Sequence, residues 1–319
     1  NLIREFASTV ETLYIIEELE PYMEEQIKAA GIKCIGKELI PNIYELNPDI
    51  VAEALLNKKN ETKSIDINIV PRPPVLCAGC PHRGFFYTMA KKKLPVTGDI
   101  GCYTLGAAAP LESIDTCICM GAGISAGMGM AKAFEVSKND TKVFGVVGDS
   151  TFFHSGITGA IDVLYNKGRM VPVILDNRIT GMTGHQENPG TGRTLMGEPT
   201  VQVDIVEILK AIGYKKIGIV DPCDLKAMDA VIEEAKASTE PYAIVTKRPC
   251  VLIKGLPPFT TKCKVISENC KKCKMCLKVG CPAIFFKDGV SYIEQAMCVG
   301  CEVCMQVCKF NAIEKVGEQ

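Results

Sequence analysis

Seventeen cysteines in a chain of 319 residues are the side chains best suited to chemistry in this sequence. Eight lie within the last 50 residues, in two runs that read C-x2-C-x2-C-x4-C-P and C-x2-C-x2-C-x3-C. Thiolates at such spacing can ligate iron–sulfur clusters or zinc, or can pair as disulfides. Zinc sites usually join two C-x2–4-C pairs across a wider gap and often use histidine, which this segment lacks. Disulfides suit small secreted domains, so iron–sulfur ligation is the prediction.

Both runs resemble those of bacterial two-cluster ferredoxins, in which the fourth cysteine of each run ligates the other cluster. Segments 265–285 and 290–310 also resemble two duplicated ferredoxin halves. The first run has one extra residue before its last cysteine, and Lys309 replaces the usual proline after the second; we expect the fold to tolerate both departures. The resemblance implies two 4Fe–4S clusters, one bound by Cys270, Cys273, Cys276 and Cys308, the other by Cys298, Cys301, Cys304 and Cys281.

Polar residues follow two predicted strands in the middle of the chain. Segments 141–147 and 171–175 are rich in β-branched and apolar residues, and apolar residues at helical spacing predict a helix between them. The first strand leads into Gly148-Asp149-Ser150 and the second into Asn177. This βαβ pattern places polar residues at the carboxyl ends of two parallel strands, where open α/β sheets bind their ligands.

These residues suit a diphosphate that is bridged through Mg²⁺. The cation prefers oxygen ligands, which Asp149, Asn177 and the backbone carbonyl of Ile179 could supply. The turn at Gly148 would present amides of the following helix to an anion. The alternative is a plain strand–turn–helix unit in which the aspartate caps the helix. Asn177 stands 28 positions after Asp149, which resembles the thiamine-diphosphate signature, with Ser150 in place of its usual glycine.

The loop at 180–186 is similar to the one that follows this asparagine in the 2-oxoacid:ferredoxin oxidoreductases. Segments 72–87, 99–106 and 148–156, together with the cysteine runs, resemble the large subunit of the indolepyruvate (arylpyruvate) ferredoxin oxidoreductases within that family. The resemblance implies an α/β fold: a thiamine-diphosphate-binding parallel-sheet domain with a C-terminal two-cluster ferredoxin-like domain. It also implies that the cofactor is bound by Gly148, Asp149, Ser150, Asn177, Ile179 and Thr183.

The resemblance further implies an enzyme that oxidatively decarboxylates a 2-oxoacid, such as indolepyruvate, to an acyl-CoA. Its cofactors would be thiamine diphosphate, Mg²⁺ and 4Fe–4S clusters, with coenzyme A accepting the acyl group and a ferredoxin accepting the electrons. We expect the activating glutamate, the pyrimidine-binding domain and a smaller beta- or gamma-type subunit to lie outside this sequence. The alternatives are pyruvate or 2-oxoglutarate as substrate, a non-catalytic iron–sulfur electron-transfer subunit, and a zinc-binding interaction protein.

Some members of the family hold a further cluster beside the thiamine. The matching cysteines here are a C-x2-C pair, Cys77 and Cys80, then Cys102 in an Ile-Gly-Cys segment and Cys250 after the last predicted strand. We hypothesise that these four ligate a third 4Fe–4S cluster; the alternative is a surface C-x2-C and two buried thiols. The cysteines to which we assign no role are Cys34, Cys117, Cys119, Cys223 and Cys263.

The three histidines are possible acid–base groups at neutral pH. His154 and His185 flank the presumed cofactor loops and are the catalytic candidates, with a purely structural role as the alternative; His82 follows the C-x2-C pair. The glycine-rich segment 120–130 lacks the order of a dinucleotide-binding loop. We interpret it as a small-residue helix packed beneath the cofactor, or equally as an ordinary tightly packed helix.

We predict four parts of the chain. Residues 1–60, with a strand at 12–17 and helices at 4–10, 21–30 and 48–57, resemble the tail of a transketolase C-terminal-like domain. Residues 61–75 form a linker, 76–256 the thiamine-diphosphate domain and 257–319 the ferredoxin-like domain. Helices at 204–212 and 225–237, with a strand at 217–220, continue the parallel-sheet pattern.

Composition excludes several classes of protein. Hydrophobic residues at 47% exclude a disordered chain, and 36 Lys+Arg against 37 Asp+Glu give no excess of positive charge for nucleic acid. No apolar run reaches the ~18–20 residues that span a bilayer. Because no signal peptide is visible, we expect a cytoplasmic protein, and the exposed clusters favour an anaerobic source.

Overall fold

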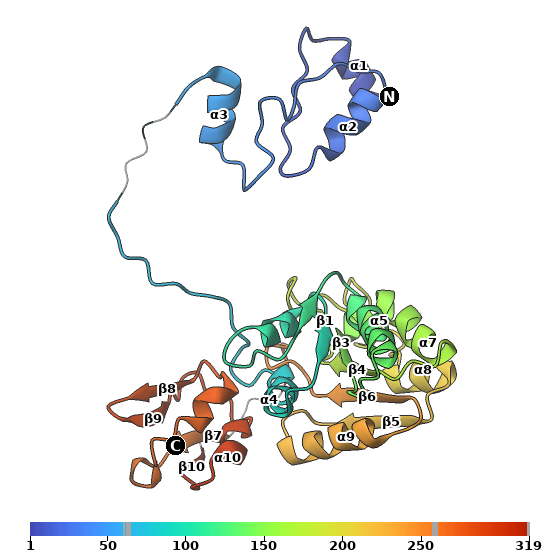
Figure 1. The fold of residues 1–319 in the computed structure, drawn as a ribbon. Coiled ribbons are helices and arrows are strands. Elements are labelled where there is room, and N and C mark those ends of the chain that lie inside the picture. The colour runs from blue at the N-terminus through green and yellow to red at the C-terminus, as the bar shows by residue number, and fades with distance from the viewer. Residues whose placement is uncertain (60, 62–64, 257–260, 318–319) are drawn as a thin grey trace. The chain divides into compact units, whose positions relative to one another are not determined.

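The computed structural model describes residues 1–59, 61, 65–256 and 261–317. The chain divides into two compact units, Asn1–Arg72 and Pro73–Gln319, each of which is described by itself (Figure 1). The predicted linker 61–75 and the predicted domain boundary at 257 fall partly on residues outside those described. The four-part domain division therefore stays a prediction.

The first unit contains three short helices: α1 (Leu2–Ala7), α2 (Tyr22–Ala29) and α3 (Pro48–Leu56). Asn47 caps α3 by accepting a hydrogen bond from the Ile50 amide at 2.9 Å. The predicted strand at 12–17 is wrong. Its backbone makes one isolated parallel bridge, between Tyr14 and Ile35, because only that segment runs alongside it. A single bridge does not build a ladder.

The second unit is built on a six-stranded sheet in which every neighbouring pair is parallel. The parallel α/β architecture predicted from the sequence is confirmed. Strand β3 begins at Phe144 rather than at the predicted 141, because its partners start pairing there: Val96 on one side and Val171 on the other. In spatial order the strands are β2 (Thr116–Cys117), β1 (Val96–Gly98), β3 (Phe144–Gly148), β4 (Val171–Asp176), β6 (Tyr242–Lys247) and β5 (Lys216–Val220).

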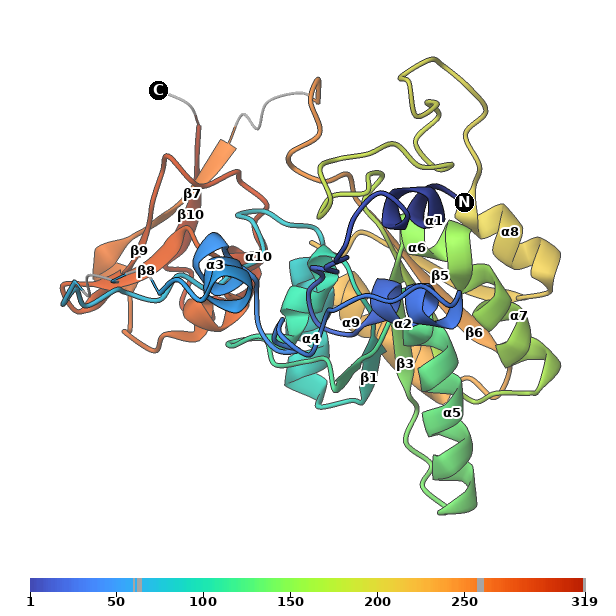
Figure 2. The same cartoon turned by 90° about the horizontal axis from the view of Figure 1, so that it is seen from above.

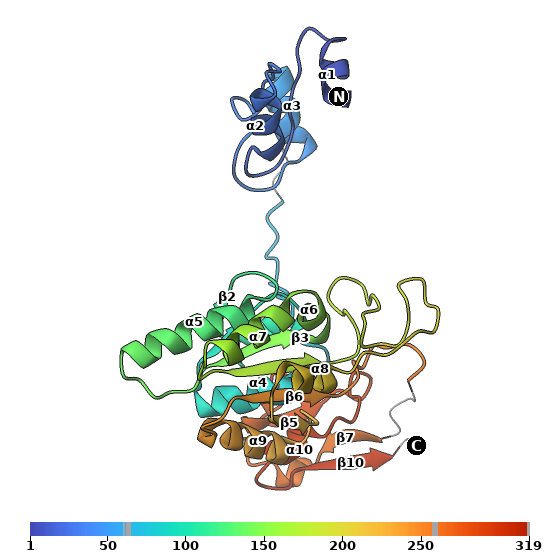
Figure 3. The same ribbon diagram turned by 90° about the vertical axis from the view of Figure 1, so that its right-hand side faces the viewer.

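Helices cover both faces of this sheet (Figure 3). On one face, α4 (His82–Lys92) and α9 (Leu225–Ala237) bury Phe85 and Met228 against the strands. On the other face lie α5 (Ala122–Val136), α7 (Ile157–Tyr165) and α8 (Ile205–Ile212). The helix predicted after β3 starts as α6 (Asp149–Thr151) and passes through a π-helical turn, η2 (Phe152–Gly156), before α7. Such turns occur often at functional sites.

Helix α5 approaches β3 backbone to backbone, which explains its glycines. A Cβ added at Gly123 would lie 2.0 Å from the carbonyl oxygen of Val146, and one at Gly145 would lie 2.5 Å from the carbonyl oxygen of Gly123. Close packing predicted for the glycine-rich segment is therefore confirmed. Gly129, on the same helix, has no atom within 4 Å of an added Cβ.

Two glycine substitutions in α5 test this packing. We expect Gly123→Ala to lower the free energy of unfolding by about 1–3 kcal/mol, because the helix must move away from the sheet. Gly129→Ala, the matched control, should raise it by up to about 1 kcal/mol, because alanine favours the helix. Urea unfolding measures both. Equal effects of the two substitutions would contradict the backbone contact.

The C-terminal part of the second unit consists of two small antiparallel pairs that pack around cysteines (Figure 2). Strand β7 (Thr261–Val265) pairs with β10 (Ile313–Gly317), and β8 (Ile284–Lys287) pairs with β9 (Val290–Ile293). The first half carries the short helical elements η3 (Ser267–Asn269) and η4 (Met275–Val279), and the second carries α10 (Val303–Val307). This duplicated arrangement is the predicted ferredoxin-like fold. Across the described residues, no helix is both long and apolar enough to cross a membrane.

Candidate functional site

Three polar side chains meet at the carboxyl edge of the sheet. Asp99 follows β1, Asp149 follows β3 and Asn177 follows β4. The register of the parallel pair β3–β4 sets Gly148 opposite Leu175, so the chains leave the sheet side by side at Asp149 and Asp176. All three of these polar residues are almost fully buried, with exposures of 0%, 2% and 5%. The sequence prediction that Asp149 and Asn177 share one edge is thus satisfied in space.

The oxygen atoms around Asp149 are arranged as a cation would require. In one orientation of the Asn177 amide, its oxygen lies 2.8 Å from the Ile179 carbonyl oxygen and 3.2 Å from Asp149 Oδ1. Oxygens this close repel one another unless a cation or a proton lies between them. Rotation of the amide instead lets its nitrogen donate to both. The three predicted Mg²⁺ ligands therefore converge, and they fit a hard cation.

Asp149 is a buried carboxyl that, in the described ranges of the chain, has no basic side chain as a hydrogen-bond partner. Its oxygens accept from the Ser150 amide at 2.8 Å and from Asn188 Nδ2 at 3.1 Å. Burial, and then the neighbouring Asp176 carboxyl, raise the pKa of Asp149 to about 7. A divalent cation would reverse this effect, because it stabilises the ionised carboxylate.

A cavity with about 510 Å³ of empty space opens at this edge. Every residue that the resemblance assigned to cofactor binding lines it. A Cβ added at Gly148 would lie 2.8 Å from the Tyr103 ring, so glycine is required for Tyr103 to approach. The other residues that line the cavity are His82, Ile100, Gly101, Cys102, Met120, Thr151, Thr180, Gly181 and Met182.

The catalytic histidines proposed from the sequence do not line this cavity. His154 and His185 are both exposed, so their catalytic role stays a prediction without structural support. His82 lines it instead: its ring is 3% exposed, and its Nε2 lies 3.4 Å from Asn177 Nδ2. Burial lowers the pKa of His82 to about 4, which keeps the ring neutral at pH 7.

Asp99 and Tyr103 form a second buried pair that the sequence analysis did not select. The Tyr103 hydroxyl donates to Asp99 Oδ1, and Asp99 Oδ2 accepts from the Gly121 amide at 2.6 Å. Burial raises the pKa of Asp99, and burial together with Asp99 raises the pKa of Tyr103. The pair joins the loop after β1 to the start of α5. The sequence signal that could have found it is the segment 99–106, which contains both residues and was used for the family resemblance only.

The four cysteines of the hypothetical third cluster lie near one another beside the cavity. Burial raises the pKa of Cys102, and the nearby thiols of Cys250 and Cys77 raise it further. Cys80 is buried, and its thiol lies near the thiols of Cys77 and Cys102. Cys102 Sγ lies 3.3 Å from the position of a Cβ at Gly181, in the cavity wall. The fold thus gathers cysteines from three separate segments at the cofactor edge.

The eight ferredoxin-type cysteines line two separate cavities, of about 340 and 360 Å³ of empty space. Each cavity takes three cysteines from one run and the fourth from the other run, which is the division that the resemblance implied. The first is lined by Cys270, Cys273, Cys276 and Cys308. The second is lined by Cys281, Cys298, Cys301 and Cys304. We call them the first and second cysteine cavities; both suit a group with four thiolate ligands.

Two cysteines without an assigned role lie against the second cysteine cavity. The Cys263 amide donates to Cys298 Sγ at 3.3 Å, and the Cys223 thiol contacts the Cys301 thiol, a contact that raises the pKa of Cys223. Cys117 and Cys119 are exposed, so they do not belong to the core. In the described residues, no three His, Cys, Asp or Glu side chains are placed to hold a single metal ion.

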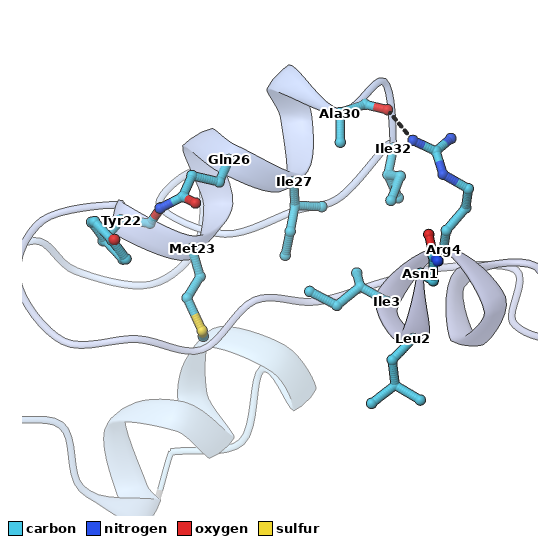
Figure 4. Close-up of a pocket in the computed structure, with 10 residues that line it drawn as sticks. All are labelled: Asn1, Leu2, Ile3, Arg4, Tyr22, Met23, Gln26, Ile27, Ala30 and Ile32. Atoms are coloured by element: carbon cyan, nitrogen blue, oxygen red, sulfur yellow. Dashed lines mark hydrogen bonds between the residues drawn. The ribbon is translucent and has the colours of Figure 1, made fainter.

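A further cavity, in the first unit, offers little chemistry (Figure 4). It is lined mainly by apolar side chains of α1 and α2, such as Leu2, Ile3 and Met23. Its one charged side chain, Arg4, donates to the Ala30 carbonyl at 2.8 Å. We therefore place the functional site in the second unit.

Comparison with known families supports this placement. Residues 99–246 match the family "Thiamine pyrophosphate enzyme, C-terminal TPP binding domain". Residues 291–314 match the "4Fe-4S binding domain" family. The first match contains Asp99, Asp149 and Asn177, and the second contains the second cysteine run. The fold and the site therefore define the second unit as a thiamine-diphosphate-binding domain joined to a ferredoxin-type iron–sulfur domain.

The whole chain is 34% identical to the indolepyruvate oxidoreductase subunit IorA of Pyrococcus horikoshii, over 100% of this chain and 55% of that subunit. It is also 34% identical to IorA of Methanothermobacter thermautotrophicus, over 100% of this chain and 54% of that subunit. The chain is similar to these subunits along its whole length, as its sequence indicated, and spans about half of theirs. A solved 2-oxoglutarate:ferredoxin oxidoreductase from Magnetococcus marinus is 21% identical over 56% of this chain and 65% of that chain, with a TM-score of 0.44.

The raised pKa of Asp149 predicts that cation binding depends on pH. Mg²⁺ must displace the proton, so its affinity should rise about fivefold from pH 6 to pH 7, about tenfold from pH 6 to pH 8, and level off above pH 8. Calorimetric titration with Mg²⁺ and thiamine diphosphate measures this. Asp149→Asn should weaken binding and remove this pH dependence, while the exposed control Asp140→Asn should behave like the natural protein. An affinity unchanged between pH 6 and pH 8 would contradict the site.

Proposed function

We propose that this chain is part of a 2-oxoacid:ferredoxin oxidoreductase that converts an arylpyruvate, such as indolepyruvate, to the corresponding acyl-CoA. The observation that carries the proposal is that the Asp149 cavity and three groups of cysteines lie within one compact unit. The names of the IorA relatives support the substrate class. The chain covers about half of those subunits, and in this proposal another domain or subunit completes the active site.

In this proposal, Asp149, Asn177 and the Ile179 carbonyl hold Mg²⁺, and the amides after Gly148 face the diphosphate. Thiamine diphosphate supplies an electron sink for decarboxylation when bound. His82 stays neutral and fixes the orientation of the Asn177 amide. The buried Asp99–Tyr103 pair holds the loop that carries Cys102 against the cavity.

The cysteine groups supply the electron path. Iron–sulfur clusters accept single electrons, which suits stepwise oxidation better than a nicotinamide does. Cys102 lines the cofactor cavity and also belongs to the group of four cysteines proposed for the third cluster. A cluster bound by that group would therefore be the first electron acceptor after the thiamine. The two cysteine cavities of the ferredoxin-like part would carry electrons onward to an external ferredoxin.

The iron content of the purified chain tests the number of clusters. We expect about twelve iron and about twelve acid-labile sulfide per chain, because three groups of four cysteines are available. Cys102→Ser should lower both to about eight, while Cys117→Ser, an exposed cysteine outside these groups, should leave them unchanged. About eight iron in the natural chain would overturn the third cluster.

An assay of the assembled complex tests the activity. With coenzyme A present, we expect arylpyruvates to reduce a viologen dye faster than pyruvate or 2-oxoglutarate does. Asp149→Asn should reduce the rate at least about 100-fold, because it removes the charge that binds the cation. Asp140→Asn should keep the rate. A fully iron-loaded complex that reduces the dye with none of these acids would favour a non-catalytic electron carrier, and a preference for pyruvate would overturn the substrate class.

A further inference from the structure

Arg83 is a fully buried cation between two groups of cysteines. It is the second residue of α4, three positions after Cys80, and its side chain is 1% exposed. It also lines the second cysteine cavity, with Cys281 and Cys301. A guanidinium keeps its charge at any physiological pH, so this position holds a permanent positive charge in the interior.

The guanidinium ties two cysteine loops together. Nη2 donates to the carbonyl oxygens of Leu76 at 2.6 Å and Cys77 at 2.8 Å, in the C-x2-C loop. Nη1 donates to the carbonyl oxygens of Val279 at 3.1 Å and of Gly280, in the turn that leads to Cys281. Each of the four Nη hydrogens is therefore donated to a backbone carbonyl. Two of these carbonyls lie near the start of the second unit and two lie in its C-terminal part.

One donor of Arg83 has no partner among the residues that the structure describes. A guanidinium carries five N–H donors, and here Nε is buried without a hydrogen-bond acceptor. A buried donor left unsatisfied costs free energy, so an acceptor is expected at this point. Arg83 lines the second cysteine cavity. A cluster bound in that cavity would offer its sulfur atoms as hydrogen-bond acceptors to Nε.

The charge of Arg83 is also unbalanced. None of its hydrogen bonds reaches a carboxylate, and no ion pair involves it among the described residues. An uncompensated buried charge is strongly destabilising. A 4Fe–4S cluster with four thiolate ligands has a net charge of about −2 when oxidised and about −3 when reduced, and would supply the missing counter-charge.

We propose that Arg83 is a positioning residue for the cluster of the second cysteine cavity, where its Nε–H donates to a cluster sulfur. Its charge favours the reduced state and raises the reduction potential of this cluster above that of the first cavity. The first cavity has no comparable group: the lysines that line it, Lys271 and Lys274, are exposed, so solvent screens them. The inference rests on cluster ligation as proposed above.

Redox titration followed by electron paramagnetic resonance tests the proposal on the iron-loaded full chain. In Arg83→Gln, we expect the ratio of reduced to oxidised second-cavity cluster to fall about tenfold at a fixed potential, which corresponds to about 59 mV for one electron. Arg83→Lys should shift less, because it keeps the charge and loses Nε–H. The first-cavity cluster should not change, nor should any cluster in the exposed control Arg169→Gln. Full iron content with all potentials unchanged in both Arg83 variants would overturn the proposal.

A second measurement begins with the natural chain, and the variants then assign its signal to Arg83. In the natural chain with ¹⁵N-labelled arginine, pulsed paramagnetic resonance of the reduced protein should detect a nitrogen coupled to the cluster. Arg83→Lys should remove this coupling, and Arg169→Gln should retain it. A natural chain with full iron and no coupling would overturn the role of Nε. A chain without iron and acid-labile sulfide would instead overturn cluster binding itself, so the two failures are distinguishable.

Discussion

The parallel pairing of β3 with β4 is the constraint on which the site depends. Because both strands run the same way and Gly148 lies opposite Leu175, Asp149 and Asn177 leave the sheet at the same edge although 28 positions separate them in the chain. Helix α5 holds β3 in place by backbone contact at Gly123, and Gly148 lets Tyr103 close over the turn. The buried oxygens then meet where an open α/β sheet binds its ligands.

The second physical theme is the balance of buried charge. Asp149 is a buried acid that needs a cation, and Arg83 is a buried base that needs an anion. Within the described part of the chain, neither residue forms a hydrogen bond or an ion pair with a side chain of opposite charge. Mg²⁺ with a diphosphate would satisfy the first residue, and an iron–sulfur cluster would satisfy the second. The same groups that complete the chemistry would therefore also relieve the electrostatic cost of the fold.

Much of this arrangement could be predicted from the sequence, because it is encoded locally. The strand–Gly-Asp turn, the Asn177 that follows the next strand and the two cysteine runs have fixed spacing, and the structure places them as that spacing predicts. The helix at 225–237 was predicted to the residue, because an aspartate cap and a regular apolar pattern define its start and face.

The rest depends on contacts between distant segments, which periodicity does not report. His82 contacts Asn177, 95 positions away, and Arg83 joins its own loop to carbonyls 196 and 197 positions away, so neither role could be recognised from neighbouring residues. His154 was selected for its closeness to Asp149 in sequence, but the π-helical turn η2 leaves its side chain exposed. The strand predicted at 12–17 had the right composition and lacked a partner of sufficient length.

Anomalous X-ray diffraction of the assembled complex, crystallised with Mn²⁺ in place of Mg²⁺ and with thiamine diphosphate, tests the central claim most directly. The account predicts a manganese peak within coordination distance of Asp149, Asn177 and the Ile179 carbonyl, with the diphosphate in the same cavity. It also predicts iron peaks in both cysteine cavities and beside Cys102. A manganese peak away from these oxygens, or a diphosphate bound elsewhere on the chain, would contradict it.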